Sequence, residues 1–169
     1  MTPELRIRTA TENDVPLIFR FRELAEYERL AHEVVATEAS LRETLFGTRR
    51  FAEVLLVESG GDAAAFALFF HNYSTFLGRP GIYLEDLYVR PELRGRGYGK
   101  ALLARLAAIA QERGCGRLEW AVLNWNESAI RFYRSLGALP QTEWQVYRVT
   151  GEALEALARQ ADRESRPSP

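Results

Sequence analysis

The chain has 169 residues, of which 47% are hydrophobic, and this size suits one domain with a sizeable core. Its 22 basic and 23 acidic side chains nearly cancel, which argues against a general binder of nucleic acid or membrane surfaces. The single cysteine, Cys115, excludes an internal disulfide and a multi-cysteine zinc site, and with only two histidines no metal is expected. Because the N-terminus lacks a signal-peptide pattern and no apolar run could span a bilayer, we expect a cytoplasmic protein.

The chain up to residue 73 predicts one strand, two helices and a hairpin. Residues 5–10 indicate a strand, and residues 11–30 a helix capped by Asn13 or Asp14. Thr37 opens a shorter helix over residues 37–46, with a small polar residue followed by an acidic one. Two apolar runs, 51–59 and 63–73, flank the turn at 60–62 and predict a β-hairpin.

The remaining elements complete an α/β pattern. Residues 74–81 predict a loop and residues 82–89 a strand, followed by a glycine-rich loop and a helix that Gly114 ends. A strand over 116–124, a helix over 126–137 capped by Asn126 and closed by Gly137, a strand over 142–150 and a helix over 152–161 follow. We therefore expect helices on both faces of a mixed sheet, in one domain over residues 1–161 with a disordered tail at 162–169.

Three glycines, Gly95, Gly97 and Gly99, directly precede an Ala/Leu-rich helix. Glycine lets backbone N–H groups approach a ligand and adopt conformations that other residues avoid. The positive end of the following helix faces the same point. This arrangement suits a bulky anion, usually a phosphate.

Two familiar phosphate loops do not fit this stretch. A P-loop requires a hydroxyl residue after its lysine, but Ala101 follows Lys100, and Arg94 stands where the first glycine belongs. A dinucleotide fingerprint requires its third glycine at Lys100, and Glu119, at the distance of a ribose ligand, falls in mid-strand. The pattern that remains is Arg-x-x-Gly-x-Gly, between a strand and a helix.

The run LEDLYVRPELRGRGYGKALL resembles the acyl-CoA loop of the GNAT superfamily of N-acyltransferases. The later run NWNESAIRFYRSLGA resembles the second cofactor segment of the same superfamily, in which an Asn precedes a helix that bears a Tyr. The resemblance covers most of the chain and implies a mostly antiparallel central sheet and acetyl-CoA as acetyl donor. It implies these cofactor-binding residues: Leu87, Tyr88, Val89, Arg94, Gly95, Arg96, Gly97, Tyr98, Gly99, Lys100, Asn126, Ser128 and Ala129.

Within the superfamily, RELAEYERL, YLEDLYV and WNESAIRFYRSLGA resemble the diamine (spermidine/spermine) and thialysine acetyltransferases. This resemblance implies a homodimer whose active sites use residues of both subunits. It also implies substrate-side positions at Tyr27, Glu28, Glu85 and Glu119, and Trp120 is the tryptophan that best suits the wall of a substrate cleft. The loop at 74–81 has no acidic residue, where polyamine enzymes tend to place one.

Acyl transfer to an amine requires an acid and a base. The departing thiolate has a parent pKa of about 8.5, and Tyr133 is the best candidate to protonate it; the alternative is a tyrosine that only packs beside Phe132. An alkylamine with a pKa near 10.4 must lose a proton before it attacks. Glu85 and Asp86 lie in an apolar strand, and alternation lets at most one of them face the acetyl group; we choose Glu85, although both carboxylates could be structural.

We therefore predict an acetyl-CoA-dependent N-acetyltransferase that acts directly on a primary amine of a small cationic substrate, such as a diamine, a polyamine or a thialysine-like compound. Acetylation of a protein N-terminus or lysine is one alternative, and a CoA-binding regulatory module without catalysis is another. Glu28 and Glu85 favour a small cation, and the presence of Tyr133 favours catalysis.

Overall fold

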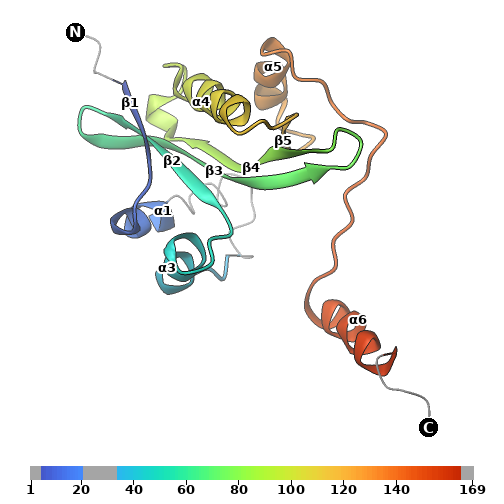
Figure 1. Cartoon of the computed structure of the whole chain (residues 1–169). Coiled ribbons are helices and arrows are strands. Elements are labelled where there is room, and N and C mark those ends of the chain that lie inside the picture. Colours follow the sequence, from blue (N-terminus) through green and yellow to red (C-terminus); the bar gives the residue numbers. More distant parts are fainter. Residues whose placement is uncertain (1–4, 21–33, 165–169) are drawn as a thin grey trace. The chain divides into compact units, whose positions relative to one another are not determined.

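The computed structural model describes residues 5–20 and 34–164 and divides the chain into two compact units, Met1–Trp125 and Asn126–Pro169. The first unit contains a five-stranded sheet (Figure 1). Its strands lie in the order β1 (Leu5–Thr9), β2 (Glu53–Ser59), β3 (Asp62–Ser74), β4 (Arg79–Val89) and β5 (Leu118–Trp120). The first four pair antiparallel and β5 pairs parallel with β4, which confirms the predicted mixed, mostly antiparallel sheet.

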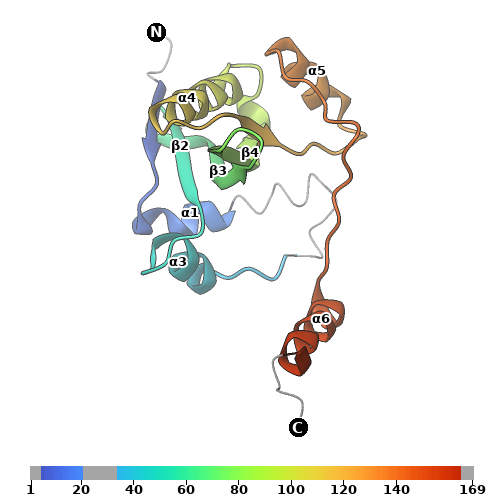
Figure 2. The same cartoon turned by 45° about the vertical axis from the view of Figure 1, so that its right-hand side comes forward.

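Helices cover both faces of this sheet (Figures 1 and 2), as the α/β pattern predicted. Helix α4 (Tyr98–Glu112) lies on one face, and α1 (Val15–Arg20) and α3 (Glu38–Phe46) lie on the other, which we call the α1/α3 face. A 3-10 turn, η1 (Glu12–Asp14), leads into α1, and a second, η3 (Pro91–Leu93), follows β4. The second unit contains α5 (Glu127–Ser135) and α6 (Gly151–Glu164).

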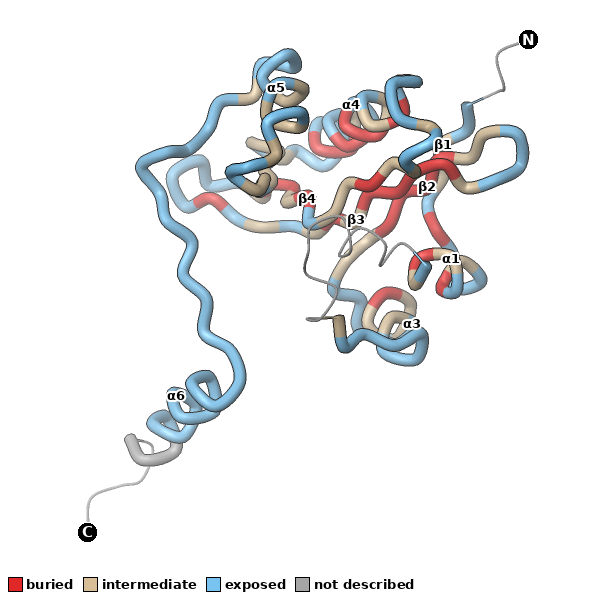
Figure 3. Tube along the Cα trace, turned by 180° about the vertical axis from the view of Figure 1, so that it is seen from behind, coloured by how far each residue is buried: buried red, intermediate tan, exposed pale blue. Residues whose placement is uncertain are grey.

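Consecutive residues of β2 and β3 are buried, so both faces of these strands contribute to the core of the first unit (Figure 3). Phe66 of β3 and Tyr88 of β4 pack with Ile18 and Leu45 of the helices on the α1/α3 face. On α4 the fully buried side chains include Leu102 and Leu106. No helix among residues 5–20 and 34–164 is both long and apolar enough to cross a membrane.

Several predicted boundaries are wrong. The cap of the first helical segment is Thr11 rather than Asn13 or Asp14, because the Asp14 carboxylate accepts bonds from the Thr11 N–H and hydroxyl. Half of the predicted loop at 74–81 is strand, since Ser74 pairs with Arg79 and leaves a four-residue turn. β5 keeps only three residues of the predicted strand at 116–124.

The predicted strand at 142–150 is also wrong, because this segment has no regular structure. A strand needs a neighbour for its backbone groups, and the described residues of the second unit include no other strand. The caps at Thr37, Asn126, Gly114 and Gly137 are confirmed. Helix α6 continues past Ala161 to Glu164.

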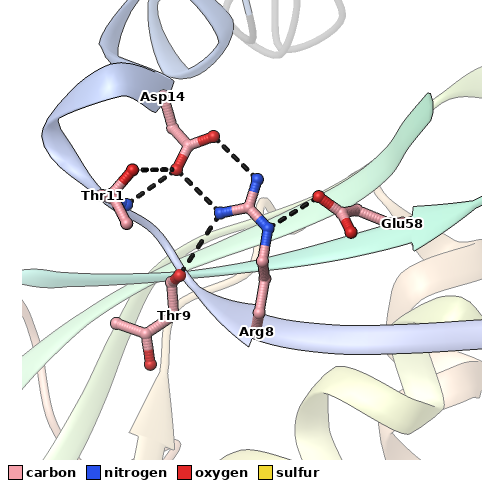
Figure 4. A network of polar contacts seen from close by, with 5 residues as sticks. All are labelled: Arg8, Thr9, Thr11, Asp14 and Glu58. Atoms are coloured by element: carbon pink, nitrogen blue, oxygen red, sulfur yellow. Dashed lines mark hydrogen bonds and ion pairs between the residues drawn. The ribbon is translucent and has the colours of Figure 1, made fainter. Parts of the chain in front are cut away.

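An ion-pair network fastens β1 to η1 and β2 (Figure 4). The Arg8 guanidinium donates two hydrogen bonds of 2.8 Å to Asp14 and one of 2.6 Å to Glu58. Hydrogen bonds from Arg8 lower the pKa of Asp14 to about 2, and those from Thr11 add to this effect. Because the Asp14 side chain is only 12% exposed, this network stabilises the fold more than a surface pair would.

We expect Asp14→Asn to lower the free energy of unfolding at pH 7 by roughly 2 kcal/mol, the equivalent of the pKa depression. The folded-state pKa lies below the ordinary value of 3.8, so the stabilisation is present above pH 4 and is lost as the pH falls from about 4 to about 2. Urea unfolding at pH 7 and at pH 2 to 4 should show the gap between variant and wild type closing in acid. A constant gap across this range would contradict the assignment, and the exposed Asp62→Asn serves as the control.

Candidate active site

A β-bulge interrupts β4 at its two acidic residues. Leu84 pairs with Phe69 and Asp86 pairs with Leu68, so Glu85 is an extra residue without a partner on β3. The alternation that the sequence analysis assumed across Glu85 and Asp86 therefore does not hold here. Asp86 lies on the α1/α3 face because its pair Leu68 packs against the core of that face, whereas Leu84 lies on the α4 face with Phe69.

The same bulge decides which peptide groups face the β5 side of β4. The Ile82 N–H donates to Arg117 of the β5 segment, whereas beyond the bulge the Arg90 N–H donates to Ala64 of β3. By alternation, Leu87 and Val89 turn their N–H and C=O groups away from β3. β5 pairs with β4 only as far as Leu84, so these groups have no strand beside them among the described residues. A row of unpaired donors can bind a carbonyl oxygen on which negative charge develops.

The glycine loop leads from this edge into the N-terminus of α4. Gly95 and Gly97 have φ angles of +76° and +86°, which other residues rarely adopt, and a Cβ at either position would meet no atom within 4 Å. The first helical hydrogen bond of α4 is donated by the Ala101 N–H to Gly97, which leaves the N–H groups of residues 98–100 without a helical acceptor. The arrangement has the open space, donors and helix dipole that a phosphate requires.

The side chains of the predicted cofactor residues divide into two groups. Arg96 and Lys100 are exposed at the loop, and Arg94 donates to the Val89 carbonyl oxygen at 3.1 Å, which ties the loop to the end of β4. Tyr88 and Tyr98 are buried, with the Tyr98 hydroxyl 2.8 Å from Ser59 on β2. Tyr98 can therefore offer the loop only its backbone, and the Tyr88 N–H points towards β3.

The second unit carries the other predicted residues on α5. The Asn126 side-chain oxygen accepts hydrogen bonds from the Ala129 N–H at 3.2 Å and from the Ser128 hydroxyl at 3.1 Å, and so caps this helix. Tyr133 is half-buried, and its ring centroid lies 5.4 Å from that of Phe132. The contact with Phe132 agrees with the packing that the sequence offered as an alternative role for Tyr133.

The predicted substrate-side residues are scattered over β4, β5 and the N-terminal region. Tyr27 and Glu28 lie outside the described residues. Glu85 is exposed at the bulge. Glu119 pairs with Tyr83 and Trp120 with Leu84, so Glu119 faces the α1/α3 side and Trp120 the α4 side. The two side chains therefore lie on opposite faces of β5.

Glu119 also has close partners that the sequence analysis missed. The Asn72 amide donates to its Oε2 at 2.7 Å, and Arg117 Nε lies 2.8 Å from the same oxygen. Neither Asn72 nor Arg117 belongs to a motif. Only the sheet register brings β3 and the β5 segment together here.

The acetyltransferase (GNAT) family model matches residues 20–138, which include the bulge, the glycine loop and α5. The chain belongs to the GNAT family. It is 42% identical over 164 residues to a thialysine N-epsilon-acetyltransferase of Bos taurus, with 90% of this chain and 96% of the relative covered. It is also 37% identical to the L-ornithine N5-acetyltransferase NATA1 of Arabidopsis thaliana, with 90% and 87% covered.

Among solved structures, an integron cassette protein from the mobile metagenome of V. cholerae matches with a TM-score of 0.78 and 28% identity. That match covers 92% of this GNAT chain and 98% of the solved one. The relatives and the family together identify this chain as an N-acetyltransferase, which confirms the enzyme class that the sequence predicted.

Proposed function

We propose that this GNAT enzyme transfers the acetyl group of acetyl-CoA directly to a primary amine of a small basic substrate. The observation that carries the proposal is the bulge in β4, which turns the peptide groups of Leu87 and Val89 towards an edge that β5 leaves unpaired, directly before the glycine loop. The named relatives act on thialysine and L-ornithine, which supports a small amine as acceptor.

Acetyl-CoA supplies the activated acetyl group as a thioester. The residues that would hold it are Gly95 to Lys100 through their backbone, with Arg96 and Lys100 beside the phosphates and Asn126, Ser128 and Ala129 from the second unit. The family match runs across the boundary between the two units, which supports one acetyltransferase domain over residues 1–161.

Residues of the chain have three separate roles in the reaction. The N–H groups of Leu87 and Val89 are placed to stabilise negative charge on the carbonyl oxygen. Glu85 attracts the cationic amine and accepts its proton, directly or through water. Tyr133 donates the proton that the departing thiolate takes up.

Acetylation of protein N-termini or lysines is the second candidate function. It is less well supported, because the named relatives that this chain matches over 90% of its length act on small amines. Thiol release from acetyl-CoA, measured with purified protein against diamines, polyamines, basic amino acids and lysine-containing peptides, tests the proposal. Release with a small amine supports it, whereas release only with peptides would replace it by the second candidate.

The phosphate loop can be tested at Gly97. Gly97→Val places a branched side chain in the space beside the loop and strains a φ of +86°, so we expect acetyl-CoA to bind at least about tenfold more weakly, or roughly 1.4 kcal/mol. Gly114→Val is a matched control, because Gly114 at the other end of α4 also has a positive φ, +66°, and open space. Calorimetric titration should show weaker binding in the first variant only. If the folded Gly97→Val and Gly114→Val variants bind acetyl-CoA with the same affinity, the phosphate-loop assignment is wrong.

The expectations of a two-fold homodimer and of a cytoplasmic location belong to this proposal. Closed two-fold pairs are the commonest assembly of soluble homo-oligomers. Sedimentation at micromolar concentration tests the dimer, and a 19.2 kDa species alone would contradict it.

A further inference from the structure

A mixed polar cluster lies on the α1/α3 face of the sheet, where β4 has not yet reached the bulge and is farthest from the glycine loop. It consists of Asn72 on β3, Arg117 directly before β5 and Glu119 on β5. The Asn72 amide and Arg117 Nε approach the same carboxylate oxygen of Glu119, at 2.7 and 2.8 Å. One guanidinium and one carboxylate therefore stand side by side, so the cluster has no net charge.

Strand register places this cluster on one face. On β3, the side chains of Leu68, Phe70 and Asn72 alternate onto the face whose core includes Phe66. Glu119 pairs with Tyr83, which pairs with Phe70, so Glu119 shares that face.

A glycine makes room for the cluster on β4. Asn72 pairs with Gly81, where a Cβ would collide with the Asn72 side-chain oxygen and lie 2.9 Å from Cγ of Arg117. The Asn72 side-chain oxygen is buried there, and the amide N–H of the same side chain donates to Glu119 and orients its carboxylate. Asn72 is therefore a positioning residue.

Arg117 and Glu119 remain accessible to a small molecule. Their side chains are 35% and 34% exposed. Tyr83, the pair of Glu119, precedes the bulge residue Glu85 by two positions, about 7 Å along the strand. That distance is within the reach of a short aliphatic chain that places a terminal amine at the bulge and its other end at the cluster.

The charges of the cluster determine which chemical group suits the end of the substrate that is remote from the reacting amine. A second ammonium group, as in a diamine, would meet Glu119 but also the like charge of Arg117. A carboxylate beside an ammonium group would meet both partners, because a guanidinium fork matches a carboxylate and Glu119 matches the ammonium.

We propose that Arg117 and Glu119 form a subsite for the α-carboxylate and α-ammonium groups of a basic α-amino acid, whose side-chain amine is acetylated at the bulge. This inference rests on the proposed function and adds the acceptor class and the residues that select it. It assigns Arg117 and Glu119 to substrate specificity and leaves the acetyl-transfer groups unchanged.

The test compares each amino acid with the same molecule lacking its carboxylate charge. L-ornithine and L-lysine are assayed against 1,4-diaminobutane, 1,5-diaminopentane and L-lysinamide, with acetyl-CoA in excess. We expect the wild-type kcat/KM to favour the amino acids, and Arg117→Gln to lower it at least about tenfold for them with no loss for the analogues that lack the carboxylate. The loss should fall mainly on KM, because the subsite binds a part of the acceptor remote from the reacting amine.

Arg113→Gln is the matched control. Arg113 pairs with Glu53, the first residue of β2, with 37% of each side chain exposed, and its guanidinium lies over Phe69, whose side chain is on the α4 face. This variant should leave the preference for amino acids intact. A wild-type enzyme that acetylates the diamines as well as the amino acids, or an Arg117→Gln defect equal for all acceptors, would overturn the subsite.

Two outcomes separate this inference from the proposed function. If no small amine is acetylated, the proposed function and the subsite both fail. If amines are acetylated without regard to the carboxylate, only the subsite fails. If Arg117→Gln does not fold, the comparison of L-lysine with L-lysinamide on the wild-type enzyme still tests the subsite. Equal kcat/KM values for the two acceptors would overturn the proposal.

Discussion

Tyr133→Phe is expected to lower turnover by roughly 10²-fold, the scale of lost general acid catalysis, while acetyl-CoA affinity stays unchanged. The substitution removes only the hydroxyl, so the ring contact with Phe132 remains. The departing thiolate then has no acid beside it. Steady-state rates with an amine found by the acceptor screen, together with calorimetric binding of acetyl-CoA, measure both quantities.

A second tyrosine of the same unit provides the control. Tyr147 is exposed, with its hydroxyl 3.2 Å from Gln145, and Tyr147→Phe should leave turnover as it is. If Tyr133 only packs beside Phe132, the opposite result is expected for Tyr133→Phe. The rate would be near normal, and the variant would lose some stability if the hydroxyl has a buried partner. Near-normal turnover would leave the GNAT fold standing and remove Tyr133 from the mechanism.

Glu85→Gln should lower kcat/KM at neutral pH by about tenfold to a thousandfold, since general base catalysis contributes about 10²–10⁴-fold and water can replace part of it. The substitution keeps the shape of the side chain and removes the charge that attracts and deprotonates the amine. The defect should shrink as the pH rises towards the amine's own pKa near 10.4, where the substrate arrives already neutral. Rates of wild type and variant across pH 7 to 10 measure this rescue.

The neighbouring carboxylate is the comparison for Glu85. Asp86 lies on the α1/α3 face opposite Leu68, whereas Glu85 is the unpaired residue of the bulge. If Asp86→Asn shows the rescued defect and Glu85→Gln does not, the base is Asp86. Tyr133→Phe should show no rescue at high pH, because alkaline solution supplies no acid to the leaving group. The two pH profiles therefore distinguish the base from the acid.

Local sequence signals predicted most of the elements. Thr37 and Asn126 begin helices because their side-chain oxygens accept from backbone N–H groups three residues later, and Gly114 and Gly137 end helices because they adopt positive φ angles. The glycine loop between β4 and α4 was predicted for the same reason, since its conformations are open only to glycine. Such signals act within a few residues of the chain and can be read directly.

Strand pairing could not be predicted in this way. The sequence indicated β4 as a regular strand, but the pairing of Leu68 with Asp86 and of Phe69 with Leu84 leaves Glu85 out. The segment at 142–150 alternates like a strand yet has none to pair with among the described residues of its unit. Backbone groups of a strand are satisfied by another strand, and no local pattern states which one or in which register.

The GNAT class of this protein could be predicted from its amino-acid sequence, because the loop from Arg94 to Gly99 and the Asn126 cap are local structures with specific residue requirements. Strand pairing in the folded chain sets which peptide groups of β4 face the β5 side and which charges gather on the α1/α3 face before the bulge. Asn72 donates to Glu119, and Arg117 donates to the Tyr73 carbonyl oxygen, across more than forty residues of chain, because β3, β4 and β5 pair in one register. Register depends on the packing of the whole sheet, so it exists only once the chain has folded.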